Sequence, residues 1–271
     1  PVRRHADGPA LKPMRRAHKA MWWTLAVAAL LYGGVGVFFY FYQDSLLYYP
    51  QFTRQHADAP DFELRRDDGV VLRGWVMNPG QARAVIYFGG NGDAVQAMRL
   101  QYAAMAPQRS VYLVGYRGYS ASDGVPSQQA ILADALALFD SVKGRHSAVA
   151  VIGRSLGSGV AIYVAAQRPV EKLVLVTPYD SIARVAQDHF AIYPAGLLMR
   201  DRYESWRYAP QLRCPLLVVQ AVHDEVIGAA RTETLLRALP KPVALLKIDG
   251  VTHDSIVASP QYAAALAGFL R

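Results

Sequence analysis

Six short, almost purely apolar runs recur along this chain, at residues 84–88, 111–114, 149–152, 173–176, 216–219 and 243–246. They lack the alternation of a half-exposed strand, so we expect each to be a strand buried on both faces, as in a parallel sheet covered by helices. With 52% hydrophobic and 18% charged residues, the chain can bury such a core. The pattern predicts an α/β fold.

The segments around these runs complete the expected architecture. Residues 62–66 and 70–77 flank Asp67-Asp68-Gly69, a pattern typical of a strand, a tight turn and a second strand. Ser127 is a candidate helix N-cap. Helices are expected between the runs, at residues 93–105, 127–143, 155–166, 229–239 and 259–270. We therefore expect an antiparallel hairpin that leads into a mostly parallel sheet.

The N-terminal part follows another pattern. Residues 21–42 carry no charge, and the run at 22–42 would form a helix about 31 Å long, close to the thickness of a hydrocarbon core. Aromatic side chains gather at both ends, with Trp22 and Trp23 at one and Tyr40 and Tyr42 at the other. A cleaved signal peptide would have a shorter apolar stretch and a small-x-small site, and a buried core helix is the third alternative. The segment predicts a transmembrane anchor.

The basic charge is concentrated before this segment. Of the net charge of +8, residues 1–20 supply +5, with six Lys or Arg against Asp7 alone. The positive-inside rule therefore predicts a cytoplasmic tail at 1–20 and a single-pass protein whose domain, residues 43–271, lies on the non-cytoplasmic side, the periplasm in a bacterium. A nucleic-acid-binding face is not expected, because the remainder is weakly charged. The single cysteine, Cys214, excludes an intrachain disulfide and a cysteine-based metal site.

A candidate nucleophile follows the run at 149–152. Gly153-Arg154-Ser155-Leu156-Gly157 is a Gly-x-Ser-x-Gly motif between a predicted strand and a predicted helix. This turn would hold Ser155 in a strained conformation at a helix N-terminus, where developing negative charge is favoured. Taken alone, the motif is also compatible with a glycine-rich packing turn. Its position between strand and helix favours Ser155 as the nucleophile.

A serine nucleophile needs a base and a group that orients the base. Asp224 follows the run at 216–219, and His253 follows the last predicted strand, so the carboxyl ends of strands would present both near Ser155. His223 is a rival base and Glu225 a rival acid. For the oxyanion, we expect backbone N–H groups of Leu156 and of Asn91, in the glycine-rich turn after residues 84–88. An ordinary strand-to-helix turn is the alternative for Asn91.

Together these motifs resemble the α/β-hydrolase superfamily, and more narrowly its membrane-anchored bud-emergence type, related to palmitoyl-protein thioesterases. The resemblance covers residues 43–271. It rests on Asp-Ser-Leu-Leu-Tyr-Tyr-Pro at 44–50, Gly-Tyr-Arg-Gly-Tyr-Ser at 115–120, the motif around Ser155, Thr-Pro-Tyr-Asp-Ser at 177–181, and the Asp224 and His253 loops. One departure is Gly89, where the family usually has histidine at the oxyanion turn.

The resemblance implies a sheet of about eight strands, a Ser155–His253–Asp224 triad, and hydrolysis of carboxylic esters or thioesters without a metal or an organic cofactor. Acyl transfer or peptide hydrolysis with the same triad, and an inactive hydrolase-fold binding protein, are the alternatives. The interval 181–210 leaves room for only a small lid, which predicts a rather open triad. An acyl substrate in a lipid or a lipidated protein would suit such a site. The oligomeric state is not encoded in any of these motifs.

Overall fold

The structure, a computed structural model, describes residues 12–54 and 59–271. It divides the chain into two compact units, Pro1–Gln43 and Asp44–Arg271, which are described separately. The first eleven residues of the predicted basic tail therefore lie outside the described part.

The described part of the N-terminal unit is helix α1, which begins at Lys12 and ends at Leu47, beyond the boundary of the unit. It extends past both ends of the apolar segment predicted at 21–42. The polar residues on either side favour helix as well, and the chain leaves the helix shortly before Pro50, which lacks an N–H to donate. Within the described residues, α1 is the one helix apolar and long enough to cross a membrane, a profile that N-terminal signal sequences share.

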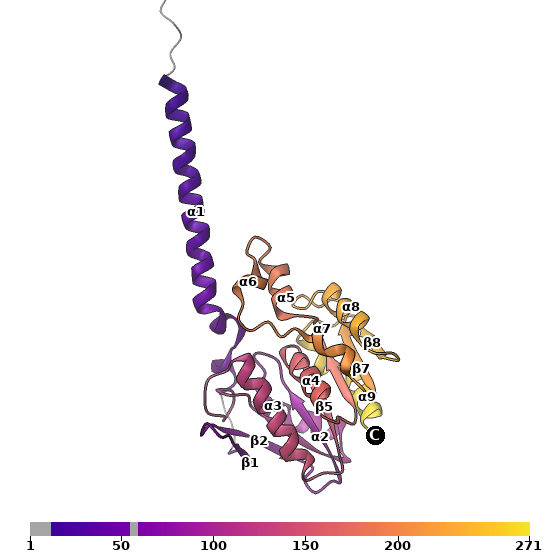
Figure 1. The fold of residues 1–271 in the computed structure, drawn as a ribbon. Coiled ribbons are helices and arrows are strands. Elements are labelled where there is room, and N and C mark those ends of the chain that lie inside the picture. Colours follow the sequence, from indigo (N-terminus) through magenta and orange to yellow (C-terminus); the bar gives the residue numbers. More distant parts are fainter. Residues whose placement is uncertain (1–11, 55–58) are drawn as a thin grey trace, which may run out of the picture. The chain divides into compact units, whose positions relative to one another are not determined.

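The second unit is built on an eight-stranded sheet in the order β1-β2-β4-β3-β5-β6-β7-β8. β1 and β2 form the predicted antiparallel hairpin, β2 pairs antiparallel with β4, and the other pairs are parallel (Figure 1). The strands are β1 (Phe62–Arg65), β2 (Val71–Met77), β3 (Arg83–Phe88), β4 (Arg109–Val114), β5 (Ala148–Arg154), β6 (Leu173–Val176), β7 (Leu216–Ala221) and β8 (Ala244–Ile248). The predicted mostly parallel sheet is confirmed.

Helices cover both faces of this sheet. The main ones are α2 (Arg99–Met105), α3 (Gln128–Lys143), α4 (Leu156–Gln167), α8 (Ala229–Ala238) and α9 (Pro260–Leu270). Alternate residues of β3 enter two separate cores: Ile86 packs in the core with α3 and α4, and Val85 packs in the core with α2 and α9. The Ser127 hydroxyl accepts a hydrogen bond from the N–H of Ala130, which confirms the predicted N-cap.

Two expectations about elements were wrong. The helix expected at 93–105 is split into a 3₁₀ turn, Val95–Met98, and α2. The run at 243–246 was expected to be buried on both faces, but β8 is exposed at Ala244, Leu245 and Lys247. β8 forms the edge of the sheet, so its apolar residues have a partner strand on one side only.

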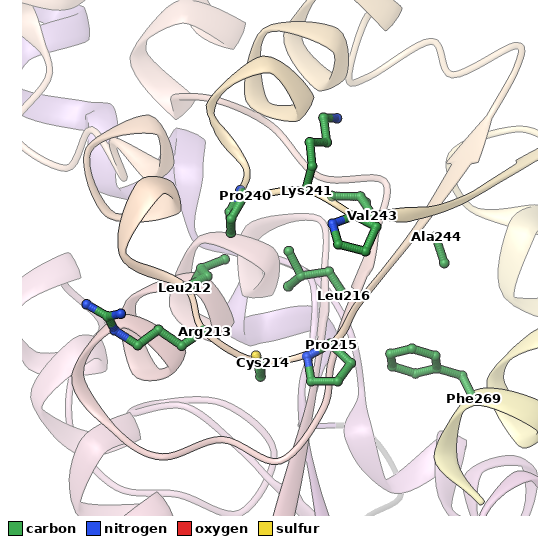
Figure 2. A pocket seen from close by; sticks show the side chains of 11 residues that line it. Leu212, Arg213, Cys214, Pro215, Leu216, Pro240, Lys241, Val243, Ala244 and Phe269 are labelled. Carbon is green, nitrogen blue, oxygen red and sulfur yellow. The ribbon is translucent and has the colours of Figure 1, made fainter.

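The predicted lid interval, 181–210, holds three short helices between β6 and β7: α5 (Ile182–His189), α6 (Ala195–Leu198) and α7 (Ser205–Tyr208). A cavity of about 850 Å³ lies at the opposite end of the sheet, where β7 and β8 begin. Figure 2 shows Cys214 and Phe269 among the side chains that line it. The cavity lies at the amino ends of β7 and β8. The predicted triad residues follow the carboxyl ends of β5, β7 and β8, so the cavity is remote from the predicted triad.

Candidate active site

Ser155 occupies a sharp turn between β5 and α4. Its backbone has φ 50° and ψ −120°, a conformation that costs a non-glycine residue free energy. The turn is held by a hydrogen bond from the N–H of Ser155 to the carbonyl oxygen of Val176, at 2.9 Å. A Cβ on Gly157 would lie 2.1 Å from the carbonyl oxygen of Phe88. Glycine at this position lets α4 begin directly against the end of β3.

The structure brings the three residues predicted for the triad together. His253 Nε2 lies 2.9 Å from Ser155 Oγ, and His253 Nδ1 lies 2.9 Å from each carboxylate oxygen of Asp224. The three come from the loops after β5, β7 and β8, whose parallel alignment places their carboxyl ends at one edge of the sheet. Ser155 is 7% exposed and His253 is 5% exposed, so this group is less open than a short lid suggests.

The rival residues lie elsewhere in the same loops. The N–H groups of Val226 and Ile227 donate to Asp224 Oδ1, at 3.0 and 2.7 Å, and so orient that carboxylate. Glu225 accepts from the backbone N–H of His253 and not from its ring. His223 is exposed and its Nε2 lies 2.9 Å from Asp249 Oδ1. The carboxylate that contacts the His253 ring is therefore Asp224 and not Glu225. The imidazole that contacts Ser155 is His253, whereas His223 contacts Asp249.

Arg154, the residue before the candidate nucleophile, connects three parts of the site. Its guanidinium pairs with Asp93, donates to the carbonyl oxygen of His253 at 3.1 Å, and donates to Asp254 at 2.8 Å. Burial opposes its charge, but the Asp93 and Asp254 carboxylates raise the pKa of Arg154 above its ordinary value. Arg154 thus ties the His253 loop to Asp93 and is buried in ion pairs.

The predicted oxyanion donors lie at two facing turns. Leu156 begins α4, and its N–H is one of those that a helix leaves without an internal acceptor. Asp93 Oδ2 accepts from the N–H of Gly90 at 2.7 Å and so shapes the turn that contains Asn91. Among residues 12–54 and 59–271, no hydrogen-bond acceptor is found for the N–H of Asn91 or of Leu156. Both groups could therefore donate to a substrate oxygen.

Gly89, the departure from the family pattern, has a physical reason in this turn. A Cβ at Gly89 would lie 3.0 Å from Cβ of Asp93, the residue that pairs with Arg154 and holds the N–H of Gly90. A histidine would require Asp93 to move. Glycine at position 89 therefore leaves room for Asp93 in the position from which it pairs with Arg154.

Large side chains in and next to the predicted lid interval divide into two groups. Tyr179, Tyr193 and Tyr203 are buried, and the Tyr179 hydroxyl donates to the carbonyl oxygen of Leu156 at 3.0 Å. Leu197 is 80% exposed, and Phe190 is half exposed. The first group therefore packs against the rest of the unit, and the second presents apolar surface within the interval 181–210.

Sequence reasoning did not identify two further parts of the site. Asp93 is only the first residue of the helix expected at 93–105, and Tyr119 is only part of a motif, although the Tyr119 hydroxyl donates to the carbonyl oxygen of Asn91. Neither contact has a local pattern, since each joins residues that the tertiary fold brings together. Within the described residues, no group of His, Cys, Asp and Glu gathers that could hold a metal ion.

Comparisons with known proteins show which family and fold this chain resembles. The family model for serine hydrolases (FSH1) matches residues 99–253. An uncharacterized protein of Mycobacterium tuberculosis is 32% identical over 245 residues, covering 85% of this chain and 87% of its own. The α/β hydrolase domain-containing protein WAV2 of Arabidopsis thaliana is 31% identical over 243 residues, covering 74% of this chain and 79% of its own.

More distant similarity extends to a yeast protein and to solved structures. Protein bem46 of Schizosaccharomyces pombe is 27% identical over 233 residues, covering 75% of this chain and 76% of its own. An esterase from Pyrococcus furiosus superimposes with a TM-score of 0.62 at 18% identity, covering 81% of this chain and 91% of its own. At that identity the likeness shows the fold alone. The chain therefore has the α/β-hydrolase fold and belongs to the serine hydrolase (FSH1) family.

Proposed function

We propose that this serine hydrolase is anchored in a membrane by α1 and cleaves carboxylic esters or thioesters of acyl substrates, with Ser155 as nucleophile, His253 as base and Asp224 as the orienting acid. One observation carries the proposal: the line of 2.9 Å contacts from Ser155 Oγ through the His253 ring to the Asp224 carboxylate. General-base activation of a serine requires a base in hydrogen-bond contact with the serine hydroxyl and a carboxylate in contact with the other nitrogen of that base.

The reaction would proceed through a covalent intermediate. Ser155 Oγ attacks the acyl carbonyl carbon while His253 Nε2 takes the hydroxyl proton, and Asp224 stabilises the resulting imidazolium through Nδ1. The N–H groups of Leu156 and Asn91 donate to the oxyanion that forms. As the tetrahedral intermediate collapses, the alcohol or thiol leaves with the proton from His253. Water then attacks the acyl-enzyme in the same way, releasing the acid and restoring Ser155.

The membrane part of the proposal rests on α1 and on charge. Its uncharged core is long enough to span a bilayer, and the six basic residues at 1–20 support a cytoplasmic N-terminus under the positive-inside rule. The catalytic unit begins at Asp44, directly after the apolar segment. It would therefore work next to the non-cytoplasmic bilayer surface, where acyl chains of lipids and lipidated proteins are abundant.

Fluorophosphonate labelling tests the chemistry. The wild-type protein should be labelled, and Ser155→Ala should abolish labelling and lower kcat at least about 1000-fold, because it removes the covalent route. Ser158→Ala is a matched control, since Ser158 is buried in the first turn of α4 and its hydroxyl has no hydrogen-bond partner among the described residues. If the Ser155→Ala variant were still labelled, the nucleophile would be a residue other than Ser155.

Chain-length dependence tests the substrate class. Each buried methylene contributes about 0.8 kcal/mol, or roughly fourfold in binding, so kcat/KM should climb steeply from two-carbon to roughly eight-carbon p-nitrophenyl esters if an acyl group is bound. Acyl thioesters of the same lengths should follow the same order. A steady fall from acetate upward would make the protein a small-ester hydrolase. Product analysis with acceptor alcohols present would reveal acyl transfer.

A further inference from the structure

The segment at 44–50, which the resemblance singled out, ends at the oxyanion turn. Leu47 is the last residue of α1, and its carbonyl oxygen accepts a hydrogen bond from the Asn91 side-chain amide at 3.2 Å. The N–H of Tyr49 donates to the carbonyl oxygen of Asn91 at 3.1 Å. Helix ends leave carbonyl groups without internal partners, and here Asn91 supplies one partner. The segment that follows the proposed anchor therefore contacts the proposed oxyanion donor directly.

The second motif without an assigned role meets the same residue. The Tyr119 hydroxyl donates to the carbonyl oxygen of Asn91 at 2.9 Å and accepts from the N–H of Tyr49 at 3.1 Å. Tyr116, in the same motif, donates to the carbonyl oxygen of Gly89 at 2.9 Å. Tyr119 is 1% exposed. A single buried hydroxyl thus joins the segment at 44–50 to the turn.

These contacts and the Asp93 carboxylate hold two different backbone groups of the turn. Asp93 holds the N–H of Gly90, whereas Tyr119 and Tyr49 hold the carbonyl oxygen of Asn91. With both flanking groups held, the peptide group between Gly90 and Asn91 has little freedom to rotate. An oxyanion donor must be preorganised, because a misplacement of about 1 Å can cost about 100-fold in rate.

The segment at 44–50 is also bonded to other parts of the same unit. The Tyr48 hydroxyl donates to Asp201 Oδ2 at 2.6 Å and lies 2.9 Å from the Tyr203 hydroxyl, and Asp44 pairs with Arg200 at 2.7 Å. Asp201 and Tyr203 belong to the lid interval. The backbone of residues 47–49 is therefore a rigid support for Asn91.

We propose that Tyr119, the Asn91 side chain and the backbone of residues 47–49 are positioning groups for the oxyanion donor of Asn91, so that the segment following the anchor is part of the catalytic apparatus. This inference rests on the proposed function. It assigns a role to both motifs that the triad does not use. The Asn91 N–H that these groups position would donate a hydrogen bond to the acyl carbonyl oxygen of the substrate.

Tyr119→Phe is the sharpest variant, because it removes one hydroxyl and retains the ring. In the full-length protein we expect kcat to fall about tenfold while KM stays within about twofold, since the oxyanion donor acts in the transition state. The inhibition constant of an acyl trifluoromethyl ketone, which forms a tetrahedral adduct, should rise by about the same factor. Asn91→Ala, at a partly exposed position, should show the same split.

Tyr112→Phe is the matched control, since it removes a hydroxyl that lies 2.9 Å from His146 and touches no part of the site. It should leave kcat and the inhibition constant unchanged. The inference is overturned if Tyr119→Phe behaves like Tyr112→Phe. It is also overturned if Tyr119→Phe lowers the Tm but leaves the ketone inhibition constant unchanged. Failure of wild-type Ser155 to react with a fluorophosphonate would instead remove the proposed function, and this inference with it.

Discussion

At the scale of single residues, the site depends on a serine in an unfavourable backbone conformation. Positive φ at Ser155 costs of order 1–3 kcal/mol, and the surrounding hydrogen bonds and close packing maintain it. Its buried hydroxyl then faces His253, and the Asp224 carboxylate contacts the far side of the ring. Strain of this kind is tolerated because the hydrogen bond from the Ser155 N–H to Val176 and the close packing of Gly157 against Phe88 hold the turn.

Exchanging the two neighbouring acids tests which of them orients the base. Asp224→Asn should keep the fold but lower kcat about 10⁴-fold, because an amide facing Nδ1 favours the wrong tautomer of His253. Glu225→Gln should lose no more than a few-fold, since its amide oxygen can still accept from the backbone N–H of His253. Steady-state kinetics on a p-nitrophenyl ester measure both. A larger loss for Glu225→Gln would contradict the assignment of Asp224.

At the scale of elements, the contact between α4 and β3 decides where the nucleophile is held. Gly157→Ala should destabilise the protein by about 3 kcal/mol or more, since the new methyl group would collide with the backbone carbonyl of Phe88. Gly144→Ala is the matched control, because its nearest neighbour would be at 3.5 Å and its φ is −64°. Urea unfolding compares the two. Equal stability of both variants would contradict the close packing.

A buried arginine at the start of β4 connects this strand to the end of α9 and to Glu171. Arg109, in β4, donates to the carbonyl oxygen of Leu270 in α9 at 2.7 Å and to Glu171 at 2.6 Å. The hydrogen bonds from Arg109 lower the pKa of Glu171 below its ordinary value of 4.5, against the effect of burial. The folded protein therefore binds the Glu171 proton more weakly than the unfolded chain.

The sign of this pKa shift makes a pH-dependent prediction. The Glu171 contribution is fully present above its unfolded pKa and is lost as the pH falls through the lower folded value. Glu171→Gln should thus cost about 2 kcal/mol at pH 7, and the difference from wild type should shrink below pH 4.5. Asp140→Asn, in an exposed pair with Arg168, should change little. Urea unfolding at both pH values checks this, and a pH-independent difference would contradict it.

At the scale of the whole molecule, the proposed membrane anchoring and its proposed orientation can be tested together. A reporter fused after Arg271 should be active only on the non-cytoplasmic side, and neutralising the six basic residues at 1–20 should weaken that orientation. Carbonate washing should leave the full chain in the membrane. A cytoplasmic reporter would overturn the proposed topology, and release of a shorter mature chain would identify the apolar segment as a signal peptide.

Patterns local in sequence determined much of this protein. The short apolar runs predicted the strands, the uncharged segment predicted a long apolar helix, and Gly153-Arg154-Ser155-Leu156-Gly157 marked a strand-to-helix turn. Each depends on neighbours within a few residues, so periodicity and turn chemistry are sufficient. Asp224 and His253 were also predicted, because both follow predicted strands and carboxyl ends of parallel strands share an edge. Their catalytic roles stay a prediction.

Other features were decided only by the tertiary structure. The exposure of β8 follows from its edge position, and strand order is not written in any one strand. The Arg154–Asp93 pair and the contacts of Asn91 with Tyr119 and residues 47–49 join segments far apart in the chain. Such contacts form only after the sheet register and the helix positions are set. Their residues therefore carry no local pattern, since packing and not periodicity brings them together.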